Sequence, residues 1–212
     1  MRIIDLGLVA YSDAEAIQRE RLDRVAAGEE DTLYLLEHPP VITLGRHGGG
    51  EHLLAAPAYL AERGITLAHS ARGGKITCHF PGQLVAYPVF HVARRPGGLR
   101  RFFADLEGAV VETAAAFGVA AESRAGFPGV WTERGKLCSI GVAVRRWTTW
   151  HGLALNVGRD LSLFDLITLC GIEGARPTSL QIERGEESPS VAEVKDVLAD
   201  AIRKRFAHSP LA

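Results

Sequence analysis

Three cysteines are the residues of this sequence that lead most directly to covalent chemistry. A cysteine reacts as its thiolate, so a nucleophilic one needs a nearby cation or base and some exposure. Cys138 lies among apolar residues in a strand pattern, which favours a buried structural thiol. Cys78 stands beside His79, so a structural role and a nucleophilic role both stay open for it. Cys170 ends an apolar segment and precedes Gly171, whose backbone can place an N–H group near the sulfur, so Cys170 is a candidate nucleophile.

Lys136 is the second candidate, because it begins a strand pattern whose alternate residues are apolar. Regular alternation would place Cys138, Ile140 and Val142 on the same face as Lys136. A lysine in such a position either extends its ammonium group to solvent or is partly desolvated. Desolvation lowers the pKa of an amine and makes it a usable base. Both alternatives stay open on these residues alone.

His38, His79 and His151 are further polar candidates. His151 shares a strand face with Leu153 and Leu155, which favours a hydrogen-bonded core histidine. No pair of these histidines has the compact spacing of metal ligands, so the sequence predicts no metal site.

These candidates depend on two strands for their positions. Residues 136–144 and 148–157 both alternate with period two, and the short connection between them predicts an antiparallel hairpin. An even number of connecting residues would set four very small residues side by side: Ser139, Gly141, Gly152 and Ala154. Such a floor either packs tightly against a neighbouring helix or lets another backbone or a ligand approach closely. Gly73 and Gly74 could likewise turn the backbone and expose N–H donors to a ligand.

The remaining pattern predicts a mixture of strands and helices. Further strands are expected at residues 2–9, 32–37, 41–44, 84–90, 119–122 and from 130, and helices at 13–27, 57–63, 98–117 and from 190. Ser12 with Glu15 and Ser190 with Glu193 read as capping boxes, and residues 126–129 read as a loop. Because no regular βαβ period occurs, we expect an α+β fold with a mixed or antiparallel sheet and packed helices.

Composition and charge limit the possible functions. The chain has 212 residues and a formal net charge of −1 at pH 7, which predicts one domain over residues 1–212 and no nucleic-acid binding. No apolar run approaches the roughly 20 residues of a membrane helix, and no signal-peptide pattern opens the chain. Three widely spaced cysteines form neither a disulfide framework nor a CxxC pair. We therefore expect a cytoplasmic protein that binds no membrane.

Several short motifs, some of which include these candidates, follow one another along the chain. They are His38-Pro39-Pro40-Val41-x-Thr43-Leu44-Gly45-Arg46, Arg72-Gly73-Gly74-x-Ile76-Thr77-x-His79-x-Pro81-Gly82-Gln83-Leu84, Gly129-Val130-Trp131, Lys136 to Gly141, His151-Gly152-x-Ala154-Leu155-Asn156-Val157, Cys170-Gly171-Ile172 and Thr178-Ser179-Leu180. Each motif alone is weak, but together they cover about residues 38–180. In this order they resemble the octanoyltransferase family of lipoate biosynthesis.

The resemblance implies a fold similar to the catalytic domains of biotin and lipoate protein ligases. It implies a single acyltransferase domain that moves an octanoyl group from octanoyl-acyl carrier protein to a lysine of a lipoyl domain. The acceptors would be the lipoyl domains of 2-oxoacid dehydrogenase complexes or the glycine cleavage protein. Carried over by motif, Cys170 is the nucleophile that forms an acyl-cysteine, and Lys136 activates its thiol. No cofactor is implied, because the thioester arrives already activated.

The same resemblance implies which residues contact the substrate. They are Arg72, Gly73, Gly74, Lys75, Ile76, Thr77, Cys78, His79, Ser139, Ile140, Gly141, Gly152, Leu153 and Ala154. The sequence departs from the family at Lys75, Cys78, Phe80 and Leu169, where glutamine, tyrosine, glycine and proline are usual. Two alternatives remain: an ATP-dependent lipoate or biotin protein ligase on the same fold, and a non-catalytic protein that binds acyl chains.

Overall fold

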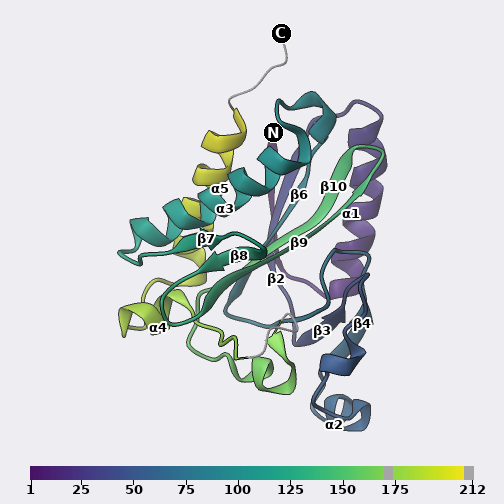
Figure 1. The fold of residues 1–212 in the computed structure, drawn as a ribbon. Helices are drawn as coiled ribbons and strands as arrows, with labels where there is room; N and C mark the ends of the chain where they lie inside the picture. The colour runs from purple at the N-terminus through teal and green to yellow at the C-terminus, as the bar shows by residue number, and fades with distance from the viewer. Residues whose placement is uncertain (170–173, 208–212) are drawn as a thin grey trace.

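A computed structural model describes residues 1–169 and 174–207 of the protein (Figure 1). It contains a seven-stranded sheet in the order β1-β2-β6-β10-β9-β8-β7 and a three-stranded sheet in the order β4-β3-β5. The strands are β1 Arg2–Leu8, β2 Thr32–Glu37, β3 Val41–Leu44, β4 Thr66–His69, β5 Ile76–His79, β6 Gln83–Val89, β7 Glu122–Arg124, β8 Phe127–Trp131, β9 Lys136–Arg145 and β10 Thr148–Asn156. The helices are α1 Tyr11–Ala26, α2 Pro57–Glu62, α3 Gly98–Ala116, α4 Leu180–Arg184 and α5 Val191–Ala207.

Both sheets are mixed, which confirms the predicted α+β class. In the large sheet β1 runs parallel to β2, whereas β2, β6, β10, β9, β8 and β7 follow one another in antiparallel pairs. In the small sheet β3 is parallel to β4 and antiparallel to β5. Among the described residues, no helix is long and apolar enough to cross a membrane.

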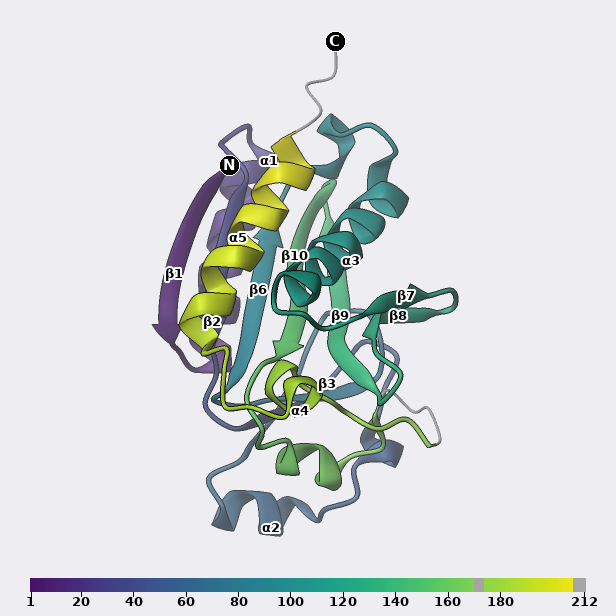
Figure 2. The same ribbon diagram turned by 90° about the vertical axis from the view of Figure 1, so that its left-hand side faces the viewer.

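Helices cover both faces of the large sheet. Figure 2 shows α3 and α5 side by side on one face, called here the α3–α5 face, with α1 on the other side. Phe102, Leu106 and Val110 recur at helical spacing on α3 and are buried in the main core against the sheet. On the opposite face, Leu22 and Val25 of α1 pack in a second core cluster with residues of β2, β6 and β10. The amphipathic pattern of these helices therefore accounts for the layered arrangement.

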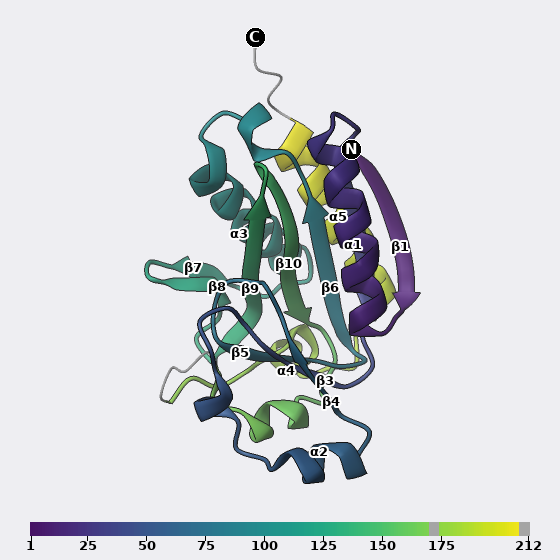
Figure 3. The same cartoon turned by 90° about the vertical axis from the view of Figure 1, so that its right-hand side faces the viewer.

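The small sheet lies below the large one, where it has its own core (Figure 3). Ile42 of β3 and Ile76 of β5 are buried there against Leu60 of α2. Residues Ser162–Leu166 form a short 3-10 helix, and its Phe164 packs edge to face on Phe80 at 5.7 Å. This packing holds the 3-10 helix against the end of β5, whereas the segment before β5 contacts the hairpin through the Gly73 N–H, which donates to the Val142 carbonyl.

The β9–β10 hairpin forms as the alternation predicts. Only Arg146 and Trp147 connect the strands, and both have left-handed φ angles, of 49° and 59°. Two such residues form the tight turn that suits the twist of a hairpin. The even connection pairs Gly141 with Gly152 and Ser139 with Ala154, so the predicted register is confirmed.

Three local predictions differ from the structure. The strand expected at residues 119–122 instead spans Glu122–Arg124 as β7. Helix α1 begins at Tyr11 after Ala10, and no side chain caps it, because Ser12 already lies inside the helix. Residues Phe127 and Pro128 belong to β8 rather than to a loop, and Phe127 pairs with Arg124 of β7. This exposed hairpin was missed because its residues lack the alternation of apolar and polar side chains that a half-buried strand has. The capping box of α5 is confirmed, since Ser190 Oγ and N both donate to Glu193 Oε2 at 2.7 Å.

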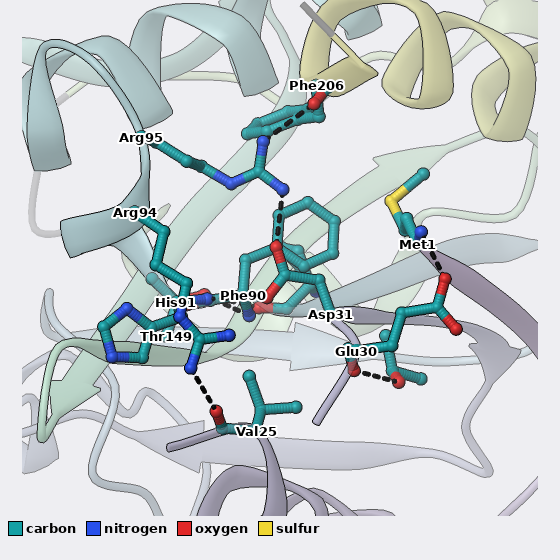
Figure 4. Close-up of polar contacts among 12 residues, drawn as sticks. Met1, Val25, Glu30, Asp31, Phe90, His91, Arg94, Arg95, Thr149 and Phe206 are labelled. Atoms are coloured by element: carbon teal, nitrogen blue, oxygen red, sulfur yellow. Dashed lines mark hydrogen bonds and ion pairs between the residues drawn. The ribbon is translucent and has the colours of Figure 1, made fainter. Parts of the chain in front are cut away.

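Charged side chains join the elements at the end of the large sheet farthest from the small one (Figure 4). Arg95 pairs with Asp31 at 2.5 Å and donates to the carbonyl of Phe206 at 2.8 Å. Its guanidinium also lies 5.0 Å from the ring of Phe90. These contacts connect the start of β2, the segment after β6 and the end of α5.

Candidate active site

A cavity of about 280 Å³ lies between the β9–β10 hairpin, the small sheet and α1. Every residue predicted to contact substrate lines this cavity except Cys78. The β5 residue Cys78 is fully buried in the core of the small sheet, whereas its neighbours Thr77 and His79 reach the cavity. Their roles as substrate contacts stay predictions, but the structure brings these dispersed motifs together around one space.

Lys136 lines the cavity because of an irregularity in β9. Val130 pairs with Cys138 but Trp131 pairs with Lys136, so Leu137 is an extra residue in the strand. A bulge of this kind reverses the alternation of side chains beyond it. Lys136 is therefore turned away from the face of Cys138, and the expectation that the two share a face is wrong.

The surroundings of Lys136 are closed to solvent. The residue is only 4% exposed, so the alternative in which its ammonium extends to solvent is wrong. Its Nζ lies 5.0 Å from the centre of the Trp131 ring, a favourable distance for a cation and an aromatic face. Its backbone N–H donates to the Arg176 carbonyl at 2.8 Å, and its carbonyl accepts from Thr178 at 3.0 Å. The segment around residues 176–178 therefore fixes the start of β9.

Cys170, the predicted nucleophile, lies outside the described residues. The two cysteines that the structure does describe are both fully buried. Burial raises the pKa of the Cys138 thiol to about 12, so this thiol stays protonated and unreactive at neutral pH. The sequence prediction of a structural role for Cys138 is confirmed.

Arg72 holds the segment that passes over the hairpin. Its guanidinium is buried and donates to the carbonyl of Thr43 at 2.6 Å and to Thr43 Oγ1 at 2.8 Å. The next residue, Gly73, donates its N–H to the carbonyl of Val142 at 3.0 Å. The Gly73 N–H is therefore already used within the protein and is not offered to a ligand.

The very small residues of the hairpin are explained by neighbouring main chain that approaches them closely. A Cβ at Gly141 would lie 3.0 Å from the carbonyl oxygen of Gly73, which crosses above it. A Cβ at Gly152 would lie 2.1 Å from the carbonyl oxygen of Ala86 on β6. Both glycines are required by neighbouring main chain, which was one of the two alternatives that the sequence left open.

Three histidines and two tyrosines form a buried ring cluster at one end of the cavity. The Tyr11 ring is nearly parallel to those of His79 and His151, with centroids 6.1 and 6.5 Å away. His38 bonds through Nδ1 to the Val9 carbonyl at 2.7 Å and through Nε2 to the Tyr87 hydroxyl at 2.8 Å. No feature of the sequence separates Tyr11 and Tyr87 from ordinary core tyrosines, so sequence reasoning missed them.

The ring cluster is uncharged. Burial lowers the pKa of His38 below 6.5, that of His79 well below 6.5, and that of His151 to about 3. Burial likewise raises the pKa of Tyr11 and, more strongly, of Tyr87. At neutral pH these five side chains are therefore neutral, and four of them line the cavity: Tyr11, His79, Tyr87 and His151.

A chain of amides connects the ring cluster with the start of β9. His79 Nδ1 bonds to Gln83 Oε1 at 2.8 Å, and Gln83 Nε2 donates to Asn156 Oδ1 at 2.9 Å. Asn156 Nδ2 donates in turn to the carbonyl of Thr178 at 2.9 Å, beside the backbone of Lys136. Because the Gln83 oxygen can only accept, Nδ1 of neutral His79 carries its proton. The chain gives a structural reason for the glutamine and asparagine of two motifs.

This arrangement suits an apolar chain that reacts at one end. The cavity combines a largely apolar interior with the buried amine of Lys136. Within residues 1–169 and 174–207, no three His, Cys, Asp or Glu side chains gather in a way that could hold a metal ion.

Comparison with known proteins agrees with this geometry. The sequence matches the lipoyl protein ligase A/B catalytic domain family over residues 10–203. An octanoyltransferase of Nitratidesulfovibrio vulgaris (strain DSM 19637 / Miyazaki F) is 63% identical over 212 residues, covering 100% of this chain and 97% of that protein. An octanoyltransferase of Maridesulfovibrio salexigens is 53% identical over 213 residues, covering 100% of this chain and 99% of that protein.

Solved structures support the fold independently. Lipoate-protein ligase A bound with ATP superposes with a TM-score of 0.78 at 17% identity, covering 97% of this chain and 85% of that one. Biotin protein ligase from Aquifex aeolicus gives a TM-score of 0.54 at 11% identity, covering 98% of this chain and 69% of that one. The predicted similarity to biotin and lipoate ligase folds is confirmed. With full-length relatives above half identity, the chain belongs to the octanoyltransferase family, within the lipoyl protein ligase A/B catalytic domain family.

Proposed function

We propose that this enzyme transfers an octanoyl group from octanoyl-acyl carrier protein to a lysine of a lipoyl domain through an acyl-cysteine on Cys170. The observation that carries the proposal is the buried Lys136 at a largely apolar cavity, with the chain that follows residue 173 running directly beside it. Octanoyltransferase relatives that match the whole length of the chain support the acyl group and the reaction class.

The proposed reaction has two halves. In the first, Lys136 takes the proton of the Cys170 thiol, and the thiolate attacks the carbonyl carbon of the octanoyl thioester. The carbon–sulfur bond to the carrier protein breaks, and the carrier leaves as a thiol after receiving the proton. In the second half, the amine of the acceptor lysine attacks the acyl-cysteine and its proton passes to Lys136. The cysteine leaves as a thiolate, and an amide is formed.

Further parts of the proposal concern partners and setting. The acceptors are lipoyl domains of 2-oxoacid dehydrogenase complexes or the glycine cleavage protein, and a single catalytic domain over residues 1–212 acts in the cytoplasm. A lipoate protein ligase and its E2 lipoyl domain form the archaeal lipoylation system of one structural neighbour, which supports a lipoyl domain as acceptor.

Mass spectrometry after incubation with octanoyl-acyl carrier protein, without ATP, tests the proposal. We expect one octanoyl group on the peptide that carries Cys170, and its loss when a lipoyl domain is added. Cys170→Ala should abolish adduct and transfer, whereas the matched variant Cys138→Ala should keep both, because Cys138 is buried and protonated.

Each other outcome identifies an alternative. A requirement for ATP would indicate a ligase, and binding without an adduct or turnover would indicate a non-catalytic acyl-binding protein. An adduct that persists on Cys78 or Cys138 in the Cys170→Ala variant would overturn the assignment of the nucleophile.

A further inference from the structure

His151 has a backbone conformation that is rare inside a strand. Its φ is +56°, in the left-handed region, where a side chain with a Cβ costs on the order of 1 kcal/mol. Among the described residues, the other non-glycine positions with positive φ are Arg146 and Trp147 in the hairpin turn. A turn needs this conformation but a strand does not, so the position of His151 requires another explanation.

The neighbours of His151 enforce this conformation. The pairing of β10 with β6 begins only at Leu153, opposite Ala86. On the neighbouring strand Pro88 has no N–H to offer a ladder. The His151 N–H instead donates to Gln18 Oε1 on α1 at 2.7 Å. The main chain therefore leaves the β6 ladder at His151, and α1 holds it in place.

His151 lies at the closed end of the cavity. It is 1% exposed, and the adjacent lining residues Tyr11 and Tyr87 are buried as well. The other end of the cavity is lined by Phe127 on β8, which is 45% exposed. Strand β9 alone separates β8 from β10, so Phe127 and His151 lie two strand spacings, roughly 10 Å, apart across the sheet.

The imidazole of His151 makes this end polar. Its Nε2 is buried and has no hydrogen-bond partner among residues 1–169 and 174–207. Buried polar atoms without a partner in the protein are uncommon, and such an atom usually bonds to a ligand or a water. A chain that ends before His151 leaves room for a water on the ring. A longer chain would press methylene groups against an unpaired nitrogen, which opposes binding.

We infer that His151 is the end stop of the acyl cavity and sets the length of the chain that the enzyme accepts. This inference rests on the proposed function and narrows its substrate to acyl groups that end before the ring. His151 is thus a specificity-determining residue, and it takes no part in the covalent steps.

Transfer from hexanoyl-, octanoyl-, decanoyl- and dodecanoyl-acyl carrier protein tests the inference. In the unaltered enzyme kcat/KM should rise to octanoyl and fall beyond it. His151→Gly relieves the backbone and removes the ring, so the ratio of kcat/KM for decanoyl over octanoyl should rise roughly fifteenfold, at about fourfold for each of the two added methylenes that become buried. His151→Asn tolerates the same backbone and keeps a shorter polar group, so its ratio should rise less. In both variants the change should appear mainly in KM for the longer chains.

Trp147→Gly is the matched control, because Trp147 has the same left-handed backbone but is 66% exposed on the hairpin turn. Its chain-length profile should equal that of the unaltered enzyme. The inference is overturned if both His151 variants keep the unaltered ratio, or if the unaltered enzyme grows more efficient from octanoyl to dodecanoyl. Absence of an octanoyl adduct on Cys170 in the unaltered enzyme would instead reject the proposed function itself.

Discussion

The two faces of the large sheet near β9 differ sharply, although the residues on them are neighbours in sequence. On the α3–α5 face Leu137 and Cys138 are fully buried among apolar side chains. On the cavity face Lys136, Ser139 and Gly141 line a space that α1 and the small sheet close only in part. One face is therefore filled by the fold, and the other keeps room and polar groups for a ligand.

This difference separates residues that stabilise the protein from those that serve its reaction. A side chain on the α3–α5 face should contribute mainly to the free energy of unfolding, because its contacts are all within the core. A side chain on the cavity face has small or polar neighbours, so its replacement should alter the reaction more than the fold. Four substitutions or titrations test this division, in decreasing order of expected effect.

Lys136→Met should show the largest effect. The rate of Cys170 acylation should fall by roughly two to four decades, the usual contribution of a general base. Methionine has a similar length and fits the same buried space, so the variant should stay folded with a measurable free energy of unfolding. Single-turnover acylation and urea denaturation measure the two quantities.

Lys136→Arg is the companion variant. It should fail to restore the rate, because a guanidinium group stays protonated at neutral pH. Acylation at the unaltered rate in either variant would remove Lys136 from the mechanism and would weaken the contrast between the faces.

Leu106→Ala on α3 should show the reverse pattern. Leu106 is fully buried in the main core, so its truncation should lower the free energy of unfolding by about 3 kcal/mol. Transfer by the folded protein should stay within a factor of two. Leu99→Ala on the same helix is the control, since Leu99 is 39% exposed and should cost under about 0.5 kcal/mol. A large loss of kcat in folded Leu106→Ala would show that the two faces are coupled.

The sequence predicted the hairpin because its alternation is strong in both strands and the turn length follows from it. It could not predict the direction of Lys136. Leu137, the extra residue of the bulge, is an apolar residue that fits either side of a regular strand equally well. The bulge depends on the register in which β9 pairs with β8, and the alternation within β9 does not set that register.

The ring cluster was also hidden, for a related reason. His151 has leucines two and four residues later, so it reads as a satisfied core histidine in a regular strand. Its left-handed backbone depends on Gln18 of α1 and on Pro88 of β6, which lie far away in sequence. Motif resemblance brought the right segments together, whereas the geometry of each side chain required tertiary contacts.

The third effect is the pH dependence of the free energy of unfolding. It should arise on the cavity face, because the titratable rings lie on that side of the sheet. Burial lowers the pKa of His38, His79 and His151. Below pH 6.5 the unfolded chain binds protons that the folded protein does not, so stability falls as pH falls through this range. A histidine contributes about 1.4 kcal/mol per pH unit only between its unfolded and its folded pKa, and for His151 this loss continues down to a folded pKa of about 3.

His151→Asn isolates one of these titrations. The slope of the unfolding free energy between pH 6 and pH 4.5 should become shallower by roughly 1.4 kcal/mol per pH unit. Trp147→Gly, at an exposed position that carries no titratable group, is the control and should leave the slope as it is. Equal slopes for His151→Asn and the unaltered protein would mean that His151 is protonated in the folded state, and the neutral cavity face would be wrong.

Cys138→Ala should show the smallest effect and tests the α3–α5 face at its closest point to Lys136. Cys138 is fully buried, so losing its sulfur should cost about 1 kcal/mol of unfolding free energy. With a thiol pKa of about 12, Cys138 should also resist iodoacetamide at pH 8 while the protein is folded. Octanoyl transfer by Cys138→Ala should match the unaltered enzyme, because the bulge at Leu137 turns this residue away from the cavity that Lys136 lines. Rapid alkylation of Cys138, or a tenfold loss of transfer in the alanine variant, would place the sulfur on the reactive side of the sheet.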